Sequence, residues 1–554
     1  MTSPASERRC SAPCSLPGGR DAGAWSAAPV GGWPARPASR SRPTVSDVVS
    51  HPGTRGRTTE LGRAARGGAI TFVGAAVSAL CGFLFNLLLA RLVGPQGAGV
   101  VLQAIATFTI ALAVGRLGLD TTAVWLLPRL SRQDPARVRA ALAGTCGLAL
   151  AVPLAGVLGW LVVWQAFLRS RDSEVLDAIT IAVVFLPAAS LMMVALAATR
   201  AFGGVAAFNA IGNVLVPALR PISLVLVVAF GGGALAISGV WAACCLVGAV
   251  LAVVILLRMV GHPSRRAAGG WLPDRALLRQ ILGFAGPRTV MAAMEQTIIW
   301  IDVLLVGALL GSVAAGVYGA ASRFVAAGVV AMTALRIVVA PRFSALLVEG
   351  RRAEVADLYT TTARWVLLLG APIYLTLGVF SPTVLGWLGP GFGDGVTPMV
   401  ILSLGSIVVL AAGNVQSLLL MSGRSGWGAF NKFVVVCFNV GANLVVIPRA
   451  GIDGAACVWA LSMALDTLLA AWQVRRGIGV SPALGAIAGT AAAVMGCVAV
   501  PSLAVVLVAG QGELQLMVAV LLSGLVLAGY CLVDRRRLRL DELASVRRRG
   551  NAPQ

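Results

Sequence analysis

The 554-residue sequence has few charged side chains and almost no lysine. Charged residues make up 12% of the chain, against 58% hydrophobic residues, and the mean hydropathy is +0.87. Soluble domains typically carry about 25% charged residues, so this composition excludes a soluble protein. Lys432 is the only lysine, and all the other basic side chains except two histidines are arginines.

Motifs for metal binding and nucleotide hydrolysis are also missing. The two histidines, His51 and His262, are too few for a zinc site, and the ten cysteines form no CxxC pair. Most cysteines lie in apolar stretches, where we interpret them as small core residues. No GxxxxGK[ST] sequence occurs, so we expect no nucleotide hydrolysis by this chain. We therefore expect neither a metal nor another cofactor.

Long apolar runs, by contrast, recur along almost the whole chain. Most have about 20 residues, the length that crosses the hydrocarbon core of a bilayer as a helix. They predict an all-α polytopic membrane protein with about 14 spans. The predicted spans are 68–91, 98–120, 140–164, 177–199, 209–230, 234–258, 281–310, 315–337, 360–380, 396–420, 429–448, 454–474, 483–509 and 514–533.

The arginines predict the orientation of these spans. If both termini are cytoplasmic, nearly all loop cations lie inside, and only Arg91, Arg169, Arg171 and Arg449 lie outside. Cytoplasmic loops carry such an excess of Lys and Arg, and an odd number of spans would remove it. The net charge of +22 therefore indicates membrane topology and not nucleic-acid binding. Because the chain is rich in Ala, Gly, Val and Arg, we expect a bacterial plasma (inner) membrane protein.

The two ends of the chain differ from its apolar body. Residues 1–66 are rich in Arg, Ser, Pro, Gly and Ala and contain no apolar run. This composition predicts a disordered basic cytoplasmic tail. Residues 534–554 form a second basic tail. It could be an amphipathic helix on anionic lipid or simply retain the topology.

Between the tails, the sequence repeats itself. LARLVGPQGAGVV resembles VGALLGSVAAGVY, which aligns Gly94 with Gly311 and Gly99 with Gly316. Three shorter matches lie at similar offsets: PRLS with PRFS, AAFN with GAFN, and VW with VW. Parallel repeats of this kind are common in transporters, with the substrate path between the halves.

The repeat divides the apolar body into three parts. They are a six-helix lobe at 67–280, a second six-helix lobe at 281–480, and two further helices at 481–533. Eight charged residues within the predicted spans are candidate site residues. The cations are Arg116, Arg220, Arg288 and Arg323, and the anions are Asp120, Glu295, Asp302 and Asp466.

Three of these charges share one stripe of the seventh span. Arg288, Glu295 and Asp302 are seven residues apart, almost two helical turns, so they project from the same side. A charge at the centre of a bilayer costs about 2.5–3.5 kcal/mol on insertion scales, so we expect this stripe to face protein or water. Glu295 lies deepest. If unpaired, it suits proton coupling; if paired with Arg220 or Arg288, it is merely neutralised.

Depth along the spans predicts a second relationship. Asp302 and Arg323 each lie roughly 12 Å below the outer end of adjacent antiparallel helices. We predict that they approach each other, as a structural ion pair in preference to a gating or substrate site. Asp466, near mid-depth in the twelfth span, is a weaker coupling candidate.

The remaining charges leave two readings open. Arg220, close to the midplane, could contact an anionic headgroup such as a pyrophosphate or form an internal ion pair. Arg116 and Arg288 lie near the cytoplasmic face, where snorkelling explains them almost as well as ligand binding. Asp120 can pair with Arg116 one turn earlier.

Three stretches carry a resemblance to a known family. They are LLLARLVGPQGAGVV, GRLGLD with Arg116, and IDVLLVGALLGSVAAGVYGAASRF. They resemble the polysaccharide-export flippases of the multidrug/oligosaccharidyl-lipid/polysaccharide exporter superfamily, over roughly residues 66–535. The resemblance implies a MATE-like V of two six-helix lobes that open alternately to either side of the membrane. It also implies a polyprenyl-linked glycan as cargo, with membrane lipids and glycan-assembly enzymes as potential partners. The family offers no role for the basic tail 1–66.

We favour a flippase for a cell-envelope glycan precursor, a transporter and not an enzyme. A cavity for organic cations would be expected to be net acidic or aromatic. The eight candidate residues instead balance four arginines against four carboxylates, which mildly favours anionic cargo. The runner-up is a cation-coupled drug or metabolite antiporter of the same superfamily. A membrane-embedded glycosyltransferase is a third reading. The lack of a carboxylate in the first outer loop argues against it.

Overall fold

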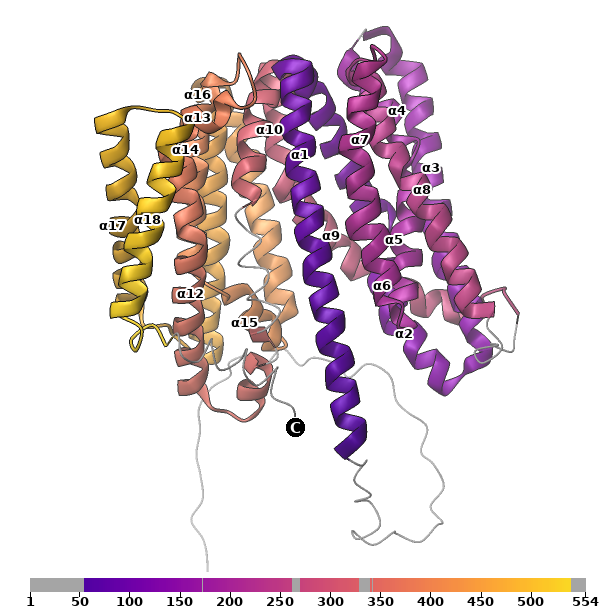
Figure 1. Ribbon diagram of the computed structural model, residues 1–554. Helices are drawn as coiled ribbons and strands as arrows, with labels where there is room; N and C mark the ends of the chain where they lie inside the picture. The colour runs from indigo at the N-terminus through magenta and orange to yellow at the C-terminus, as the bar shows by residue number, and fades with distance from the viewer. Residues whose placement is uncertain (1–53, 172, 262–269, 328–338, 341, 540–554) are drawn as a thin grey trace, which may run out of the picture. The chain divides into compact units, whose positions relative to one another are not determined.

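The computed structural model describes the chain except for residues 1–53, 172, 262–269, 328–338, 341 and 540–554 (Figure 1). The chain divides into two compact units, Met1–Leu61 and Gly62–Gln554. The described residues of the second unit are helical and contain no strand. Helix α1 begins at Thr54, within the segment predicted as a disordered tail. Residues 59–66, TELGRAAR, include several good helix formers, so the helix of the first span can extend toward the N-terminus through this segment.

The helices overlap the predicted spans but do not match them one to one. The first repeat contains α1 (Thr54–Gly115), α2 (Leu119–Gln133), α3 (Val138–Val163), α4 (Glu174–Val183), α5 (Leu186–Ala201), α6 (Val205–Phe208), α7 (Val216–Ala229) and α8 (Ala234–Gly261). The second contains α9 (Arg275–Leu310), α10 (Ser312–Ala327), α12 (Arg352–Val379), α13 (Ser381–Gly386), α14 (Val396–Ala411), α15 (Val415–Met421) and α16 (Ser425–Ile478). The last two helices are α17 (Leu484–Ala509) and α18 (Glu513–Val533).

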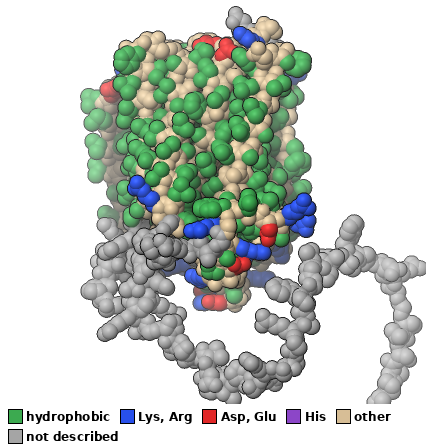
Figure 2. Space-filling view, turned by 90° about the vertical axis from the view of Figure 1, so that its right-hand side faces the viewer, with side chains coloured by type: hydrophobic (Ala, Val, Ile, Leu, Met, Phe, Trp, Pro, Cys, Tyr) green, Lys and Arg blue, Asp and Glu red, His purple; other side chains and the backbone are tan. Residues whose placement is uncertain are grey.

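The apolar helices have the length needed to cross a membrane. Among the described residues, ten pass on length and composition, or up to eleven if the bent pair α4 and α5 is one span. Two long helices, α1 and α16, break at Gly94 and Gly451 and each cover two predicted spans. Every predicted span thus overlaps a helix, while the count of 14 stays a prediction. Figure 2 shows the expected band of hydrophobic side chains, with Lys and Arg gathered toward one end.

The break of α1 at Gly94 has a repeat equivalent at Gly311, between α9 and α10. Gly94 has φ 67° and ψ −178°, and its repeat partner Gly311 has φ 91° and ψ 173°. Both lie in a region that glycine adopts readily and other residues avoid. The sequence repeat is therefore also a conformational repeat.

Just beyond these breaks, α1 and α10 cross at very close range. A Cβ added at Gly99 would lie 1.7 Å from the carbonyl oxygen of Ser312, and one at Gly316 would lie 2.0 Å from that of Pro95. The nearby Gln103 Nε2 donates to Gly99 O at 3.1 Å and lies 3.4 Å from Ser312 Oγ. Equivalent elements of the two repeats thus join the lobes at this end, and only glycine permits the approach.

Helix α9 joins the lobes at the opposite end. Its first half packs against α2 and α3, and its second half against α10 and α16. Trp125 of α2 stacks on Phe284 of α9, with ring centroids 4.4 Å apart and an interplanar angle of 5°. The predicted boundary between the lobes, after residue 280, falls inside this helix.

The C-terminal hairpin α17–α18 packs against α12 and is held there by the residues that follow it. Leu538 is buried, and its carbonyl oxygen accepts a hydrogen bond from Trp365 Nε1 at 2.9 Å. Arg364 Nη1 donates to the Arg537 carbonyl at 2.7 Å, and Arg539 pairs with Asp357. Residues 534–539 therefore fold back onto protein, and do not begin an amphipathic helix on the lipid surface. Residues 540–554 of that tail lie outside the described part.

We predict that Gly99→Ala destabilises the protein, because its methyl group must displace the Ser312 carbonyl. Overpacking of this kind lowers the free energy of unfolding by about 1–3 kcal/mol. Denaturant unfolding of the purified protein in micelles measures this free energy of unfolding. Gly156→Ala is the matched control, because a Cβ at this helical glycine meets no atom within 4 Å. Equal free energies of unfolding for the two variants would contradict the close approach of α1 and α10 at Gly99.

Candidate functional site

Asp302 of α9 is a buried carboxylate surrounded by amides of α16. Its side chain is 2% exposed, and Asn443 Nδ2 donates to Asp302 Oδ1 at 2.8 Å. The same Nδ2 lies 3.1 Å from Asn439 Oδ1, and Asn439 Nδ2 donates to Ser462 Oγ at 3.2 Å. Asn443 Oδ1 is buried and has no hydrogen-bond partner among the described residues. Four oxygen-bearing side chains from both halves of α16 and from α9 thus form one network.

These asparagines were not predicted as site residues from the sequence. Asn439 and Asn443 are four residues apart in an apolar span, a spacing that puts them on one face of a helix. Polar amides in a membrane helix usually face protein, so this spacing indicates a buried polar site. It does not indicate that Asp302 is the residue that the amides contact.

Arg323 of α10 lies beside this network and stacks on an aromatic ring. Its guanidinium carbon is 3.9 Å from the centroid of Trp300, and Nη2 donates to the Ile299 carbonyl at 3.1 Å. Asp302 and Arg323 interact electrostatically. No ion pair within 4 Å joins them among the described residues, so the expected ion pair is replaced by amide and cation–π contacts.

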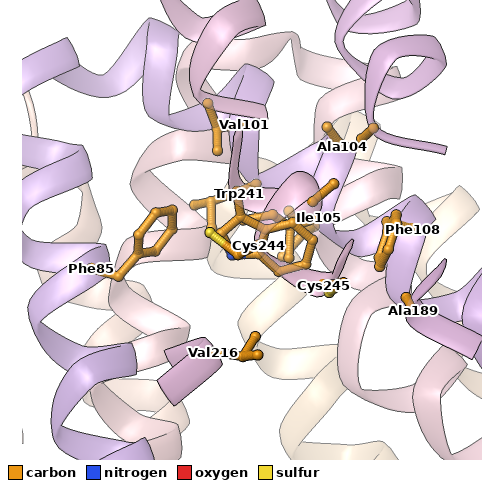
Figure 3. Close-up of a cluster of buried hydrophobic side chains, with 14 of the residues drawn as sticks. Phe85, Val101, Ala104, Ile105, Phe108, Ala189, Val216, Trp241, Cys244 and Cys245 are labelled. Atoms are coloured by element: carbon orange, nitrogen blue, oxygen red, sulfur yellow. The ribbon is translucent and has the colours of Figure 1, made fainter. Parts of the chain in front are cut away.

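Arg220 of α7 lies within the first lobe, between α7 and α8. Its guanidinium carbon is 4.0 Å from the centroid of Trp241, and Nη2 lies 3.8 Å from Cys245 Sγ. Figure 3 shows Trp241 and Cys245 in the surrounding apolar cluster with Phe108 of α1. Arg220 Nε is buried without a partner, and within the described part no carboxylate pairs with this side chain. Of the two readings of Arg220, the internal ion pair therefore finds no partner here.

Glu295 of α9 is exposed on the surface of the protein at the centre of its span. It makes neither a hydrogen bond nor an ion pair with any other described residue, Arg220 and Arg288 included. A carboxylate at this depth needs water or a polar ligand, because an unpaired charge in hydrocarbon is costly.

The other predicted cations gather where α1, α2 and α9 meet. Arg116 pairs with Asp120 at 3.3 Å, one turn along the chain. Arg288 packs against Gly118, where an added Cβ would lie 2.8 Å from Arg288 Cβ. Arg129, which the sequence analysis did not select, lies over the Trp125 ring at 4.6 Å.

Asp466 of α16 is neutralised within the second lobe. Lys432 Nζ lies 2.7 Å from Asp466 Oδ2, and Gln416 Nε2 donates to the same oxygen at 3.0 Å. The only lysine of the chain is thus committed to this carboxylate. Such a pair is a weaker coupling candidate than the unpaired Asp302.

A largely apolar groove of about 510 Å³ runs beside the junction of α1 and α10. Phe83 and Phe324 meet edge to face at its wall, with centroids 5.1 Å apart. The remaining walls come from α12, α13, α17 and α18. The lining residues are Phe83, Phe324, Pro372, Ile373, Thr376, Leu377, Val384, Trp387, Val498, Leu516, Val520, Ser523, Gly524 and Leu527.

Solved structures of low sequence identity share this fold. A lipid II flippase MurJ in an inward closed conformation aligns with a TM-score of 0.65 at 12% identity, covering 84% of this chain and 99% of that one. An inward-facing multidrug resistance MATE family transporter of the MOP superfamily aligns with a TM-score of 0.62 at 14% identity, covering 75% and 96%. The predicted fold class, a MATE-like membrane protein, is confirmed.

Sequence comparisons point to glycan synthesis. The chain is 27% identical over 177 residues to the probable low-salt glycan biosynthesis flippase Agl15 of Haloferax volcanii. This match covers 31% of the chain and 36% of that relative's length. Residues 64–347 match the family described as "Polysaccharide biosynthesis protein". Since this match covers just over half of the sequence, the chain is a multi-pass membrane protein that belongs to the polysaccharide biosynthesis protein family.

Proposed function

We propose that this protein is a flippase that moves a polyprenyl-linked oligosaccharide or polysaccharide precursor across the plasma membrane. The observation that carries the proposal is the apolar groove beside α1 and α10. Its walls include the hairpin α17–α18, which lies beyond the two repeats. A polyprenyl chain must stay in an apolar environment while its headgroup crosses, and the groove offers such an environment.

Arginines without carboxylate partners supply the complementary feature for the headgroup. Arg323 directly precedes the groove residue Phe324, and Arg220 has a buried Nε without a partner among the described residues. Guanidinium groups bind phosphate oxygens through paired donors. A guanidinium group that is already stacked on a tryptophan ring is partly dehydrated, so it loses less water when it binds phosphate than a fully hydrated guanidinium does. We propose that Arg220 and Arg323 contact the phosphates of the cargo during its passage.

Alternating access accounts for the two junctions between the lobes. We propose that the crossing at Gly99 and Gly316 closes one end of the substrate path, and that the contact of α9 with α2 restricts the other end. The structurally similar MurJ is in an inward closed conformation. We propose that the glycine crossing is the outer closure and separates when the cargo leaves.

The Asp302 network supports cation coupling of this movement. Asp302, Asn439, Asn443 and Ser462 bring side-chain oxygens together in the protein interior, and Asn443 Oδ1 lacks a partner among the described residues. A monovalent cation, a proton or sodium, would compensate the charge of Asp302 there. Binding of this cation at Asp302 would link α9 to both halves of α16. It would therefore change the packing of the second lobe.

We predict that Gly524→Leu slows transport at least about tenfold, the loss that corresponds to about 1.4 kcal/mol of tail binding. The leucine fills the groove where the tail would lie. Translocation of a fluorescent polyprenyl-diphosphate sugar in proteoliposomes measures the rate. Gly529→Leu is the control, because it lies on the same helix, is equally exposed and does not line the groove. Equal rates for both variants would remove the groove from the mechanism.

We predict that Arg220→Ala fails to restore surface glycan in a strain lacking the gene. The variant loses the paired phosphate donors, and Arg220→Lys should restore only part of the glycan. Arg169→Ala is the control, since this arginine also lies over a tryptophan, Trp164, but outside the predicted spans. Complementation by Arg220→Ala at the wild-type level, with equal protein abundance, would refute the headgroup contact.

We predict that Asp302→Asn abolishes stimulation of transport by an imposed proton or sodium gradient. The amide keeps the shape of the side chain but no longer needs a cation. Glu295→Gln should retain the stimulation, because Glu295 is exposed and has no defined ligand set. The opposite pattern would transfer the coupling role to Glu295. Rates with and without a gradient, measured in the same vesicles, separate the two residues.

A further inference from the structure

The two ends of α16 form a pocket that the transport mechanism does not use. Because the helix breaks at Gly451, its first and last turns lie together. The pocket has a volume of about 660 Å³. Its lining residues are Arg424, Trp427, Phe430, Trp472, Gln473, Arg476 and Gly477, and none of them lines the groove beside α1 and α10.

Each arginine of the pocket lies over a tryptophan. Arg424 is 4.6 Å from the Trp427 centroid, and Arg476 is 5.0 Å from that of Trp472. Within the part of the chain that the structure describes, neither arginine forms an ion pair. The pocket therefore carries two uncompensated positive charges.

Gly477 makes the pocket a packed site. A Cβ at this position would lie 2.0 Å from Arg424 Nη1 and 2.6 Å from the Trp427 ring. The guanidinium and the indole thus rest on the backbone of the last turn. Any larger residue must push them out of this position.

The surroundings of the pocket resemble a membrane boundary. The positive-inside pattern predicts that both ends of α16 lie at the cytoplasmic surface, where Trp and Arg are favoured. Exposed apolar side chains continue from the pocket along both halves of the hairpin: Phe430 is 59% exposed, Phe433 59% and Leu468 67%. Exposed side chains of this kind contact acyl chains in a bilayer.

We propose that this pocket binds the phosphate of an anionic phospholipid from the cytoplasmic leaflet. Arg424 and Arg476 bind the phosphate oxygens, the tryptophans lie at the level of the glycerol, and the acyl chains lie along Phe430, Phe433 and Leu468. Charge complementarity favours an anionic headgroup over a zwitterionic one. The site holds a structural lipid and is independent of the cargo groove.

Binding of short-chain phosphatidylglycerol to the purified full-length protein in nonionic detergent tests the proposal. Thermal stabilisation gives the apparent Kd, with phosphatidylcholine of the same chain length and inorganic phosphate as comparison ligands. We expect the wild type to bind phosphatidylglycerol in preference to both. The double variant R424Q/R476Q should bind it at least about tenfold more weakly, equivalent to about 1.4 kcal/mol.

R132Q/R275Q is the matched control, because it removes the same charge from exposed arginines outside the pocket and should bind like the wild type. Gly477→Ala tests the site with both arginines retained, and should weaken binding relative to Gly426→Ala, whose Cβ meets no atom within 4 Å. Wild-type affinity of both R424Q/R476Q and Gly477→Ala would overturn the proposal. Equal binding of inorganic phosphate, or displacement of phosphatidylglycerol by polyprenyl diphosphate, would overturn the lipid assigned to the pocket.

Discussion

The charge of Asp302 in the hydrocarbon region is the constraint on which the second lobe depends. A lone carboxylate there costs about 2.5–3.5 kcal/mol on insertion scales. The protein surrounds Asp302 with amides of α16 and places Arg323 close by without an ion pair. Asn443 donates to the carboxylate, and Arg323 interacts with its charge without a direct ion pair. We therefore propose that the network responds to a cation. By contrast, Asp466 is neutralised by Lys432 and so has no such capacity.

The same constraint explains how the arginines are distributed. Arg116 has a carboxylate partner, whereas Arg220 and Arg323 lie over tryptophan rings. A tryptophan face shields a guanidinium without neutralising it, so the cation remains available to a phosphate. The proposed passage of a lipid-linked headgroup uses these charges, while the groove beside α1 and α10 takes the tail.

Much of the fold could be predicted from the sequence, since length and hydropathy determine membrane helices. The glycine repeat found in the sequence has a counterpart in local structure, because Gly94 and Gly311 both take the positive φ that only glycine adopts easily. The crossing of Gly99 with Gly316 could not be predicted, since equivalence in sequence does not reveal contact in space. Depth counting brought Asp302 toward Arg323 but missed Asn443, because uncharged amides stand out weakly in an apolar span. The tryptophan partners of Arg220 and Arg323 lie on other turns or helices and were likewise hidden.

Transport by the purified protein in sealed vesicles tests the central claim most directly. The vesicles carry a fluorescent sugar linked to polyprenyl diphosphate in one leaflet, and parallel samples carry the same sugar without lipid or an organic cation. The account predicts protein-dependent movement of the lipid-linked sugar alone. Exchange of the organic cation without movement of the lipid-linked sugar would contradict it and favour an antiporter.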